Sequence, residues 1–182
     1  MNRDLYKLKS EIMDQQNMLR ALARISHEII ERNKGVEELC LVGIKRRGCS
    51  LADRIRDNIV RFEGKSVPCA AIDIGFYRDD LTLLSDMPLV RDASLPFSVT
   101  GQRVVLVDDV LYTGRTARAA REAVLSAGRP RSIQLAVLID RGHRELPIRA
   151  DYVGKNIPTS HRERVAVHIP PYDEEMGVLL YE

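Results

Sequence analysis

The sequence has few cysteines, almost no net charge and no long apolar run, and each shortage excludes a class of protein. The three cysteines, Cys40, Cys49 and Cys69, form no Cys-x-x-Cys pair and leave an odd thiol, so the chain carries no zinc spacing and suits a reducing compartment. No stretch is long enough to span a bilayer and no signal peptide is recognisable, so we expect a cytoplasmic protein without a membrane partner. A net charge of +2 gives no general argument for nucleic acid.

Length and composition favour one globular domain. The 182 residues are 45% hydrophobic and 30% charged, which provides enough apolar surface for a real core in a soluble chain. We find no internal repeat and no low-complexity segment. We expect residues 1–14 to be a tail or a short strand and residues 15–182 to form a single domain.

The most informative stretch runs from Val104 to Thr116. Its first four residues, Val-Val-Leu-Val, predict a strand that is buried on both faces and that stops at Asp108 and Asp109. The turn Thr113-Gly114-Arg115-Thr116 follows and leads into a helical pattern of alanines. The amides and dipole of a helix start favour a phosphate, and carboxylates accept hydrogen bonds from ribose hydroxyls. The stretch therefore predicts a site for a phosphorylated sugar.

Two other interpretations of this stretch deserve comparison. An ordinary buried strand with a solvated acidic end is possible, although a Thr-Gly-Arg-Thr turn after two acids is unusual for it. A Walker-type nucleotidase also places acids after an apolar strand, but the only candidate phosphate loop, residues 43–50, lacks the Gly-Lys-Ser/Thr ending.

A second anion site is predicted where the strand Leu39–Ile44 meets the basic turn Lys45-Arg46-Arg47-Gly48. A helix follows, with apolar residues at helical spacing. Concentrated positive charge at a helix start suits pyrophosphate. Alone the turn could equally be a plain surface loop; beside the sugar-phosphate site it becomes a pyrophosphate loop.

The rest of the chain alternates between strands and helices. In order, we expect a helix at Gln15–Asn33 stopped by Gly35, a strand at Val67–Ile74, an irregular span to Gln102, and strands at Ile133–Ile139, Val165–Ile169 and Gly177–Tyr181. Such alternation predicts a parallel sheet with its site at the carboxyl ends of the strands. The long span is typical of a lid over the site or of an arm that contacts a partner.

These motifs resemble the signature of the type I phosphoribosyltransferases, enzymes that use 5-phosphoribosyl-1-pyrophosphate (PRPP). More narrowly, Arg-Asp-Asp-Leu at 78–81, Val-Leu-Tyr-Thr-Gly-Arg-Thr at 110–116 and residues 140–159 are similar to the bacterial pyrimidine operon regulators of the PyrR family. The resemblance covers about residues 18–182. It implies an α/β fold: a mainly parallel twisted sheet flanked by helices, a flexible arm at about residues 75–102, and a small hood at about residues 140–182 with an N-terminal contribution.

The resemblance also implies roles for individual residues in a reaction of PRPP with uracil. Ribose and 5′-phosphate would contact Asp108, Asp109, Tyr112, Thr113, Gly114, Arg115 and Thr116, pyrophosphate would contact Lys45, Arg46 and Arg47, and the base would contact Asp140, Arg141, Tyr152 and Val153. Asp109 would act as general base and Arg78 would cover the leaving pyrophosphate. Mg²⁺ would bridge the donor and contact Asp108 and Asp109 through water.

Two positions depart from related patterns. Relatives commonly carry Thr-Arg where this chain has Arg46-Arg47, which preserves backbone contacts but leaves a hydroxyl contact open. Hypoxanthine-type relatives carry a lysine where this chain has Asp140 or Arg141, which argues against a purine substrate.

An RNA-binding role is a separate hypothesis. Basic residues gather on one helix face and along residues 141–164, but without the aromatic residues of a base-stacking platform, so charge alone favours a solvated surface. The family resemblance favours binding of the leader mRNA of a pyrimidine operon, through Arg20, Arg24, His27, His143, Arg144, Arg149 and Lys155.

Three activities thus stay open. The first is a bifunctional protein that makes uridine monophosphate (UMP) from uracil and PRPP and binds RNA in response to UMP. The second is a phosphoribosyltransferase for another base, and the third is a pure RNA-binding regulator that uses the site as a nucleotide sensor. The arm and the helix faces favour a homodimer or a higher homo-oligomer.

Overall fold

Two β-sheets organise the chain in the computed structural model, which describes residues 6–74 and 95–182. The larger sheet is parallel and runs in the order β3 (Cys69–Ile72), β2 (Leu39–Ile44), β4 (Arg103–Leu111), β5 (Ser132–Asp140), β6 (Tyr152–Asn156). The smaller sheet is antiparallel and runs in the order β1 (Leu8–Met13), β8 (Gly177–Tyr181), β7 (Arg164–His168). The helices are α1 (Gln15–Asn33), α2 (Arg47–Glu63) and α3 (Arg115–Ala127).

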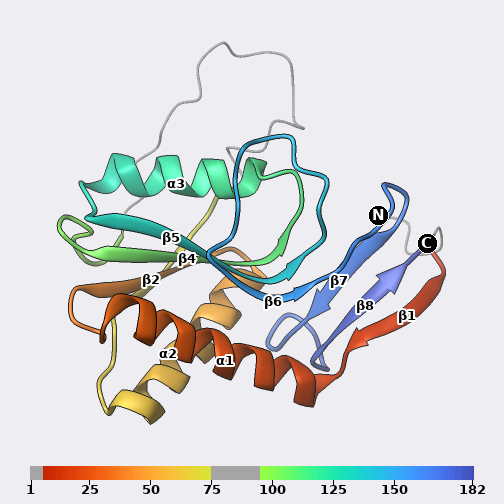
Figure 1. Ribbon diagram of the computed structural model, residues 1–182, viewed down its shortest axis with the longest axis horizontal. Helices are drawn as coiled ribbons and strands as arrows, with labels where there is room; N and C mark the ends of the chain where they lie inside the picture. The colour runs from red at the N-terminus through yellow and green to blue at the C-terminus, as the bar shows by residue number, and fades with distance from the viewer. Residues whose placement is uncertain (1–5, 75–94) are drawn as a thin grey trace.

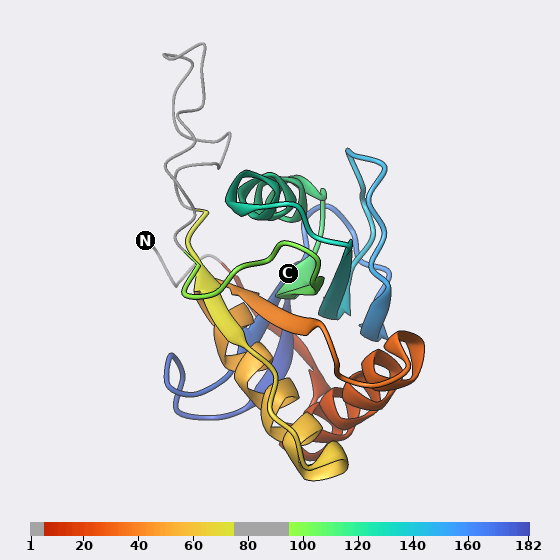
Figure 2. The same cartoon turned by 90° about the vertical axis from the view of Figure 1, so that its left-hand side faces the viewer.

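Helices cover both faces of the parallel sheet. Figures 1 and 2 show α1 and α2 on one face and α3 on the other. Alternate residues of β4 serve the two layers: Val105 and Val107 belong to the core beneath α1 and α2, and Val104 and Leu106 belong to the core beneath α3. The buried apolar run in the sequence therefore reflects a central strand that needs apolar side chains on both sides.

The smaller sheet joins the two ends of the described chain. β1 pairs with β8, and the backbones of Lys7 and Glu182 exchange two hydrogen bonds of 2.9 and 3.0 Å. Residues 8–13 are thus a strand, which was one of the two alternatives for this segment. Figure 1 shows the small sheet beside the carboxyl ends of the parallel strands. No helix within residues 6–74 and 95–182 is long and apolar enough to cross a membrane.

Several predicted boundaries shift. β4 does not stop at the two acids but continues to Leu111, because Asp108 and Leu111 keep pairing with Val137 and Asp140 of β5. β3 is shorter than predicted and covers only Cys69–Ile72. α3 begins earlier, at Arg115, so half of the predicted turn is already helical.

The stop signal of α1 also differs in detail. The left-handed residue that caps this helix is Lys34, with φ 56°, and Gly35 follows with φ 115°. The amides of both residues return to carbonyls of the last turn, at Glu31 and Ile30. Glycine therefore ends the helix as the second of two residues with positive φ.

Tyr152 occupies a different position from the one predicted. It pairs with Ala136 in the middle of β5, is only 2% exposed, and belongs to the core beneath α1 and α2. Its hydroxyl donates to Gln134 Oε1 at 2.7 Å and accepts from Asn33 Nδ2 at 3.4 Å. Burial is the main reason why the pKa of Tyr152 rises to about 12. The residue is part of a buried polar network.

We expect Tyr152→Phe to lower the free energy of unfolding by about 1 kcal/mol, because it deletes both hydrogen bonds of the buried hydroxyl while Gln134 and Asn33 stay bonded to each other. Urea denaturation measures the change. Tyr172→Phe is the matched control, since Tyr172 is 45% exposed, and it should change stability by less than about 0.5 kcal/mol. Equal effects of the two variants would contradict the buried network.

Candidate active site

The basic loop after β2 lies directly against the acidic end of β4. A Cβ on Gly48 would come within 2.4 Å of Val107 O and 3.3 Å of Asp108 Cα, so the start of α2 and the strand touch through their backbones. A Cβ on Gly43 would likewise meet Cys49 Cα at 2.6 Å. Two glycines thus bring the positive charges of Lys45 to Arg47 beside the carboxylates. The sequence predicted this proximity only because both segments follow strands of one parallel sheet.

The two acids are held by their own backbone. Asp108 Oδ1 accepts the amide of Asp109 at 3.0 Å, and Asp109 Oδ1 accepts the amide of Val110 at 2.9 Å. Asp108 is 8% exposed, whereas Asp109 is half-buried. Each carboxylate keeps acceptor capacity beyond its local bond, because an ionised carboxylate has two oxygens with about four lone-pair sites.

The predicted phosphate turn follows the same strand. Gly114, with φ 94°, is the N-cap of α3 and provides no side-chain hydrogen bond to the first-turn amides. The loop after β5 braces the turn, since Thr113 O accepts from the amides of Glu145 and Leu146 at 3.0 and 3.2 Å, and Arg115 pairs with Glu145 at 2.7 Å. A helix start whose cap has no side chain is suited to a bound anion.

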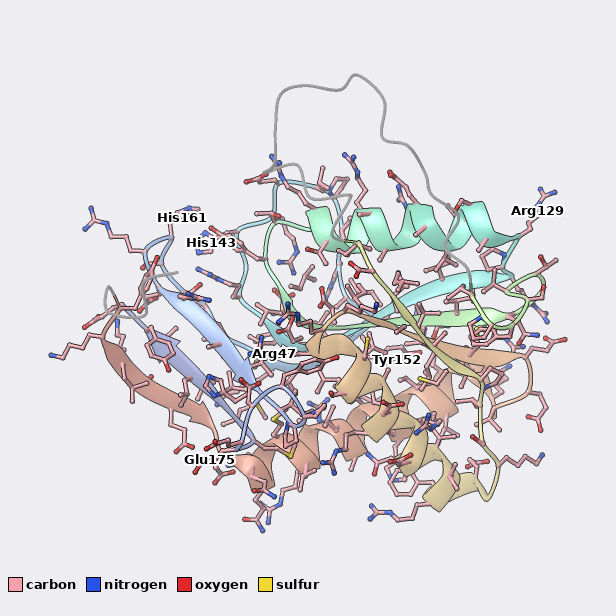
Figure 3. The ribbon with its side chains drawn as sticks, turned by 180° about the vertical axis from the view of Figure 1, so that it is seen from behind. Arg47, Arg129, His143, Tyr152, His161 and Glu175 are labelled. Carbon is pink, nitrogen blue, oxygen red and sulfur yellow. The ribbon has the colours of Figure 1, made fainter. Side chains whose placement is uncertain are left out.

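The three basic residues of the first loop differ in their partners. Lys45 lies 3.6 Å from Asp73 in an exposed pair, and Arg46 is an exposed N-cap that follows a cis peptide bond. Arg47 instead points toward the small sheet, where Nε and Nη2 each donate to Asp173 at 2.9 Å. Figure 3 shows Arg47 in the middle of the molecule, between the two sheets.

The Arg47–Asp173 pair leaves a clear electrostatic signature. Burial alone would raise the pKa of Asp173, but the hydrogen bonds from Arg47 and from the amide of Ile169 lower it below the ordinary 3.8. The bond to Asp173 raises the pKa of Arg47, and the charge of Asp109 adds to this rise. The charges of Asp109 and Asp173 therefore both contribute to the pKa of Arg47. No sequence motif points to Asp173, which is separated from Arg47 by 126 positions.

Asp140 and Arg141, predicted to contact a base, hold the surrounding loops. Asp140 accepts the amide of Gly142 at 3.0 Å and forms a short ion pair with Arg144. Arg141 is 8% exposed, and its guanidinium lies 4.1 Å from the ring of Tyr112. It also donates to residues of the segment after β6: Thr159 Oγ1, Ser160 O and Glu163 O at 2.8–3.0 Å.

A hollow of about 490 Å³ opens beside Asp140 and Arg141. Its other lining residues include Ile148, Asn156 and Ile157. Tyr152 and Val153 are not among its lining residues, and the Tyr152 side chain is buried in the core beneath α1 and α2. The prediction that Tyr152 stacks on a base is therefore wrong, and Figure 3 shows this residue well away from His143 and His161. Val153 pairs with Val137, which also pairs with Asp108, and its contact with a base stays a prediction.

The basic residues proposed for RNA binding separate into two sets. Arg20, Arg24 and Lys155 line a hollow of about 440 Å³ between α1, β1 and β6. His27 stacks on Phe62, with ring centroids 3.9 Å apart, and lies outside that hollow.

The second set follows β5. Arg149 is exposed, whereas His143 packs 4.0 Å from the ring of His161 and contacts Thr159 O. Arg144 turns inward, with its guanidinium bonded to carbonyls at Tyr112 and Ile148 and to Asp140. Arg144 therefore anchors a loop, and the geometry does not support its predicted RNA contact.

The roles of Arg78 and of the metal ligands remain predictions. Arg78 falls outside the described residues. Within residues 6–74 and 95–182, no cluster of three or more His, Cys, Asp or Glu side chains could enclose a metal ion. Asp108 and Asp109 offer oxygen ligands for at most part of a coordination shell.

Comparison with known proteins gives a consistent result. Residues 9–173 match the family described as Phosphoribosyl transferase domain. The chain is 61% identical to the Bifunctional protein PyrR of Caldicellulosiruptor bescii over 93% of both chains, and 58% identical to that of Thermus aquaticus over 97% of both. Among solved structures, the hypoxanthine phosphoribosyltransferase of Trypanosoma cruzi aligns with a TM-score of 0.74 over 96% of both chains at 21% identity, which shows a shared fold.

The lowered pKa of Asp173 leads to a pH prediction. The charged carboxylate stabilises the folded state, so its contribution is present above the ordinary pKa of 3.8 and is lost as the pH falls through the lower folded value. We expect Asp173→Asn to be less stable than the wild type at neutral pH and the gap in unfolding free energy to close below 3.8. Denaturant titrations across that range measure it, and a gap independent of pH would contradict the ion pair's contribution.

Proposed function

Because the chain belongs to the phosphoribosyl transferase domain family and, within it, to the PyrR proteins, we propose that it transfers the phosphoribosyl group of PRPP to uracil and also binds the leader mRNA of a pyrimidine operon in response to UMP. One observation carries the catalytic half of the proposal: two anion-binding loops meet at the carboxyl end of one acidic strand. Gly48 touches β4 beside Asp108, and Gly114 opens α3 just beyond that strand. A donor with phosphate at one end and pyrophosphate at the other fits two such loops.

Different residues bind the phosphate, the ribose and the pyrophosphate of the donor. The turn from Thr113 to Thr116 holds the 5′-phosphate, the carboxylates of Asp108 and Asp109 accept the ribose hydroxyls, and the loop from Lys45 to Arg47 holds the pyrophosphate. N1 of uracil bonds to C1 of the ribose while the bond from C1 to the pyrophosphate oxygen breaks. Positive charge develops on the sugar as in glycoside chemistry, and the nearby carboxylates stabilise it. Asp109, the more exposed acid, takes the proton from N1.

Magnesium fits the donor set as a partner of the substrate. Asp108 and Asp109 supply hard oxygen ligands, and Mg²⁺ is usually held by one or two carboxylates together with water and substrate phosphates. When bound, the ion would offset the repulsion between the acids and the phosphates of PRPP. The two acids would meet it through water.

The base would lie at the carboxyl ends of β5 and β6. Arg141 ties the segment from Thr159 to Glu163 to the ring of Tyr112, so these groups form a wall whose backbone N–H and C=O groups can bond a pyrimidine. Asp140 supports this wall through Arg144. Asp140 or Arg141 stands where hypoxanthine-type relatives carry a lysine that bonds the purine, which favours uracil over hypoxanthine.

Asp108→Asn combined with Asp109→Asn tests the catalytic half. Asparagine oxygens can still accept the amides of Asp109 and Val110, so the fold should persist, while loss of both charges should lower UMP formation by about 10³-fold or more. A coupled assay with uracil, PRPP and Mg²⁺ measures the rate, and circular dichroism checks the fold. Normal turnover in the folded double variant would overturn the assignment.

The RNA half rests on the arrangement of charge around β6. Gly154 and Lys155 line the hollow that holds Arg20 and Arg24, and the next residues, Asn156 and Ile157, line the hollow beside Arg141. An edge strand therefore links a basic surface to the base end of the nucleotide site. Phosphate contacts at such a surface would give a salt-dependent affinity.

Arg20→Gln combined with Lys155→Gln should weaken binding of pyrimidine-operon leader RNA and reduce the slope of log affinity against log salt by about 1.5, because two phosphate contacts are lost. UMP formation should stay unchanged. Filter binding at several salt concentrations, with and without UMP, measures the effect. Arg118→Gln combined with Arg129→Gln removes two exposed charges on and after α3 and is the control. Equal losses from the two pairs would mean that the attraction is non-specific.

Two alternative functions, the role of Arg78 and self-association of the chain remain as hypotheses. A panel of bases with PRPP separates uracil transfer from transfer to another base, and RNA binding without turnover would identify a pure regulator. Coverage of the leaving pyrophosphate by Arg78 and self-association into a homodimer or larger oligomer stay predictions, which kinetics of Arg78→Ala and analytical ultracentrifugation can address.

A further inference from the structure

The first arginine of α2 is joined by a two-point ion pair to the loop between β7 and β8 of the small sheet. Arg47 Nε donates to Asp173 Oδ2 and Arg47 Nη2 donates to Asp173 Oδ1, both at 2.9 Å. The Asp173 side chain is 15% exposed and that of Arg47 is 35% exposed, so the carboxylate is the more shielded partner. Asp173 Oδ2 also accepts the amide of Ile169 at 2.9 Å, while the Asp173 amide donates to Ile169 O at 3.2 Å. In addition to its contacts with Arg47, the carboxylate is therefore held in place by its own turn.

This geometry leaves one edge of the guanidinium available. An arginine carries five N–H donors, and the fork to Asp173 uses the Nε–H and one of the two on Nη2. The edge formed by Nη1 and the second Nη2 N–H remains for another bidentate acceptor. A pyrophosphate presents paired oxygens that suit this edge.

A second aspartate–arginine pair in the chain provides a comparison for Arg47 and Asp173. Asp151 also accepts a backbone amide, that of Leu135 at 2.8 Å, and also pairs with an arginine, Arg32, at 2.9 Å. Asp151 immediately precedes β6, at the amino end of that strand, and Arg32 lies in the last turn of α1. Arg47, by contrast, adjoins Gly48, which touches β4 beside Asp108. Asp151 thus shares the backbone bond and the arginine partner of Asp173, but its pair is a single contact and does not adjoin Gly48.

We propose that Asp173 is a positioning residue for the pyrophosphate end of PRPP: it holds Arg47 from one edge so that the opposite edge faces the donor. Asp173 does not touch the substrate and acts only through Arg47. The proposal rests on the proposed function, because it assumes that the loop from Lys45 to Arg47 binds pyrophosphate. It adds that the small sheet contributes to donor affinity.

Asp173→Asn tests the proposal, because asparagine can keep the bond from the Ile169 amide but loses the charge and the two-acceptor fork. Isothermal titration with Mg²⁺ should show PRPP and inorganic pyrophosphate bound about ten-fold more weakly, the size of one lost charge-assisted contact. UMP has no pyrophosphate, so its affinity should change by less than about two-fold. The KM for PRPP should rise while kcat at saturation stays within about two-fold.

Two further variants complete the experiment. Asp151→Asn, the matched control, should leave all three affinities unchanged. In an Arg47→Ala background, Asp173→Asn should weaken PRPP no further, because a residue that acts through Arg47 has no effect without it.

An equal loss for UMP and PRPP would identify a structural tie, and unchanged or tighter PRPP binding would also overturn the proposal. The titrations need no turnover of uracil. A wild type that binds PRPP and pyrophosphate but makes no UMP would therefore refute the uracil activity and still decide the role of Asp173. A wild type that binds neither ligand would refute both.

Discussion

The backbone contact between Gly48 and Val107 is the constraint on which the site depends. Any side chain at position 48 would place its Cβ 2.4 Å from a carbonyl oxygen of the central strand. Because Gly48 has no side chain, the loop from Lys45 to Arg47 can lie against the end of β4, where Asp108 and Asp109 are. The charge of Asp109 contributes to the raised pKa of Arg47, so the loop and the strand end are linked electrostatically.

Long-range ion pairs then attach the smaller sheet and the loops to this part of the molecule. Arg47 reaches Asp173 across 126 positions, and Arg141 binds the segment from Thr159 to Glu163. Both arginines bond through planar, multi-donor contacts, which fix orientation as well as distance. The parallel sheet supplies the catalytic edge, and these pairs determine how the surrounding segments lie over it.

Sequence reasoning predicted the parts of the fold that local chemistry determines. α1 and β2 were found at their full extent, because an amphipathic stripe and an uninterrupted apolar run leave little ambiguity. The register of β6 was not accessible, since nothing local to Tyr152 distinguishes a stacking residue from one bonded to Gln134. Pairing with Ala136 decided that point, and such pairing depends on the whole sheet.

The same limit applies to the charged residues. Motifs placed Asp108, Asp109 and the two anion loops together because each motif follows a strand of one sheet. A list of arginines cannot tell which of them face water, and Arg144 proved to be bonded inward. Asp173 carries no motif at all, so only its distance to Arg47 reveals its part in the site.

The inward bonds of Arg144 have a consequence for ligand affinity. They tie the loop after β5 to the end of β4 through Tyr112 O and to the loop's own far side through Ile148 O. A loose loop would lose about 1–2 kcal/mol of backbone entropy per residue on closing around a ligand. Here that ordering has already taken place during folding, so the wall that we propose for the base is preorganised and binding energy can be retained as affinity.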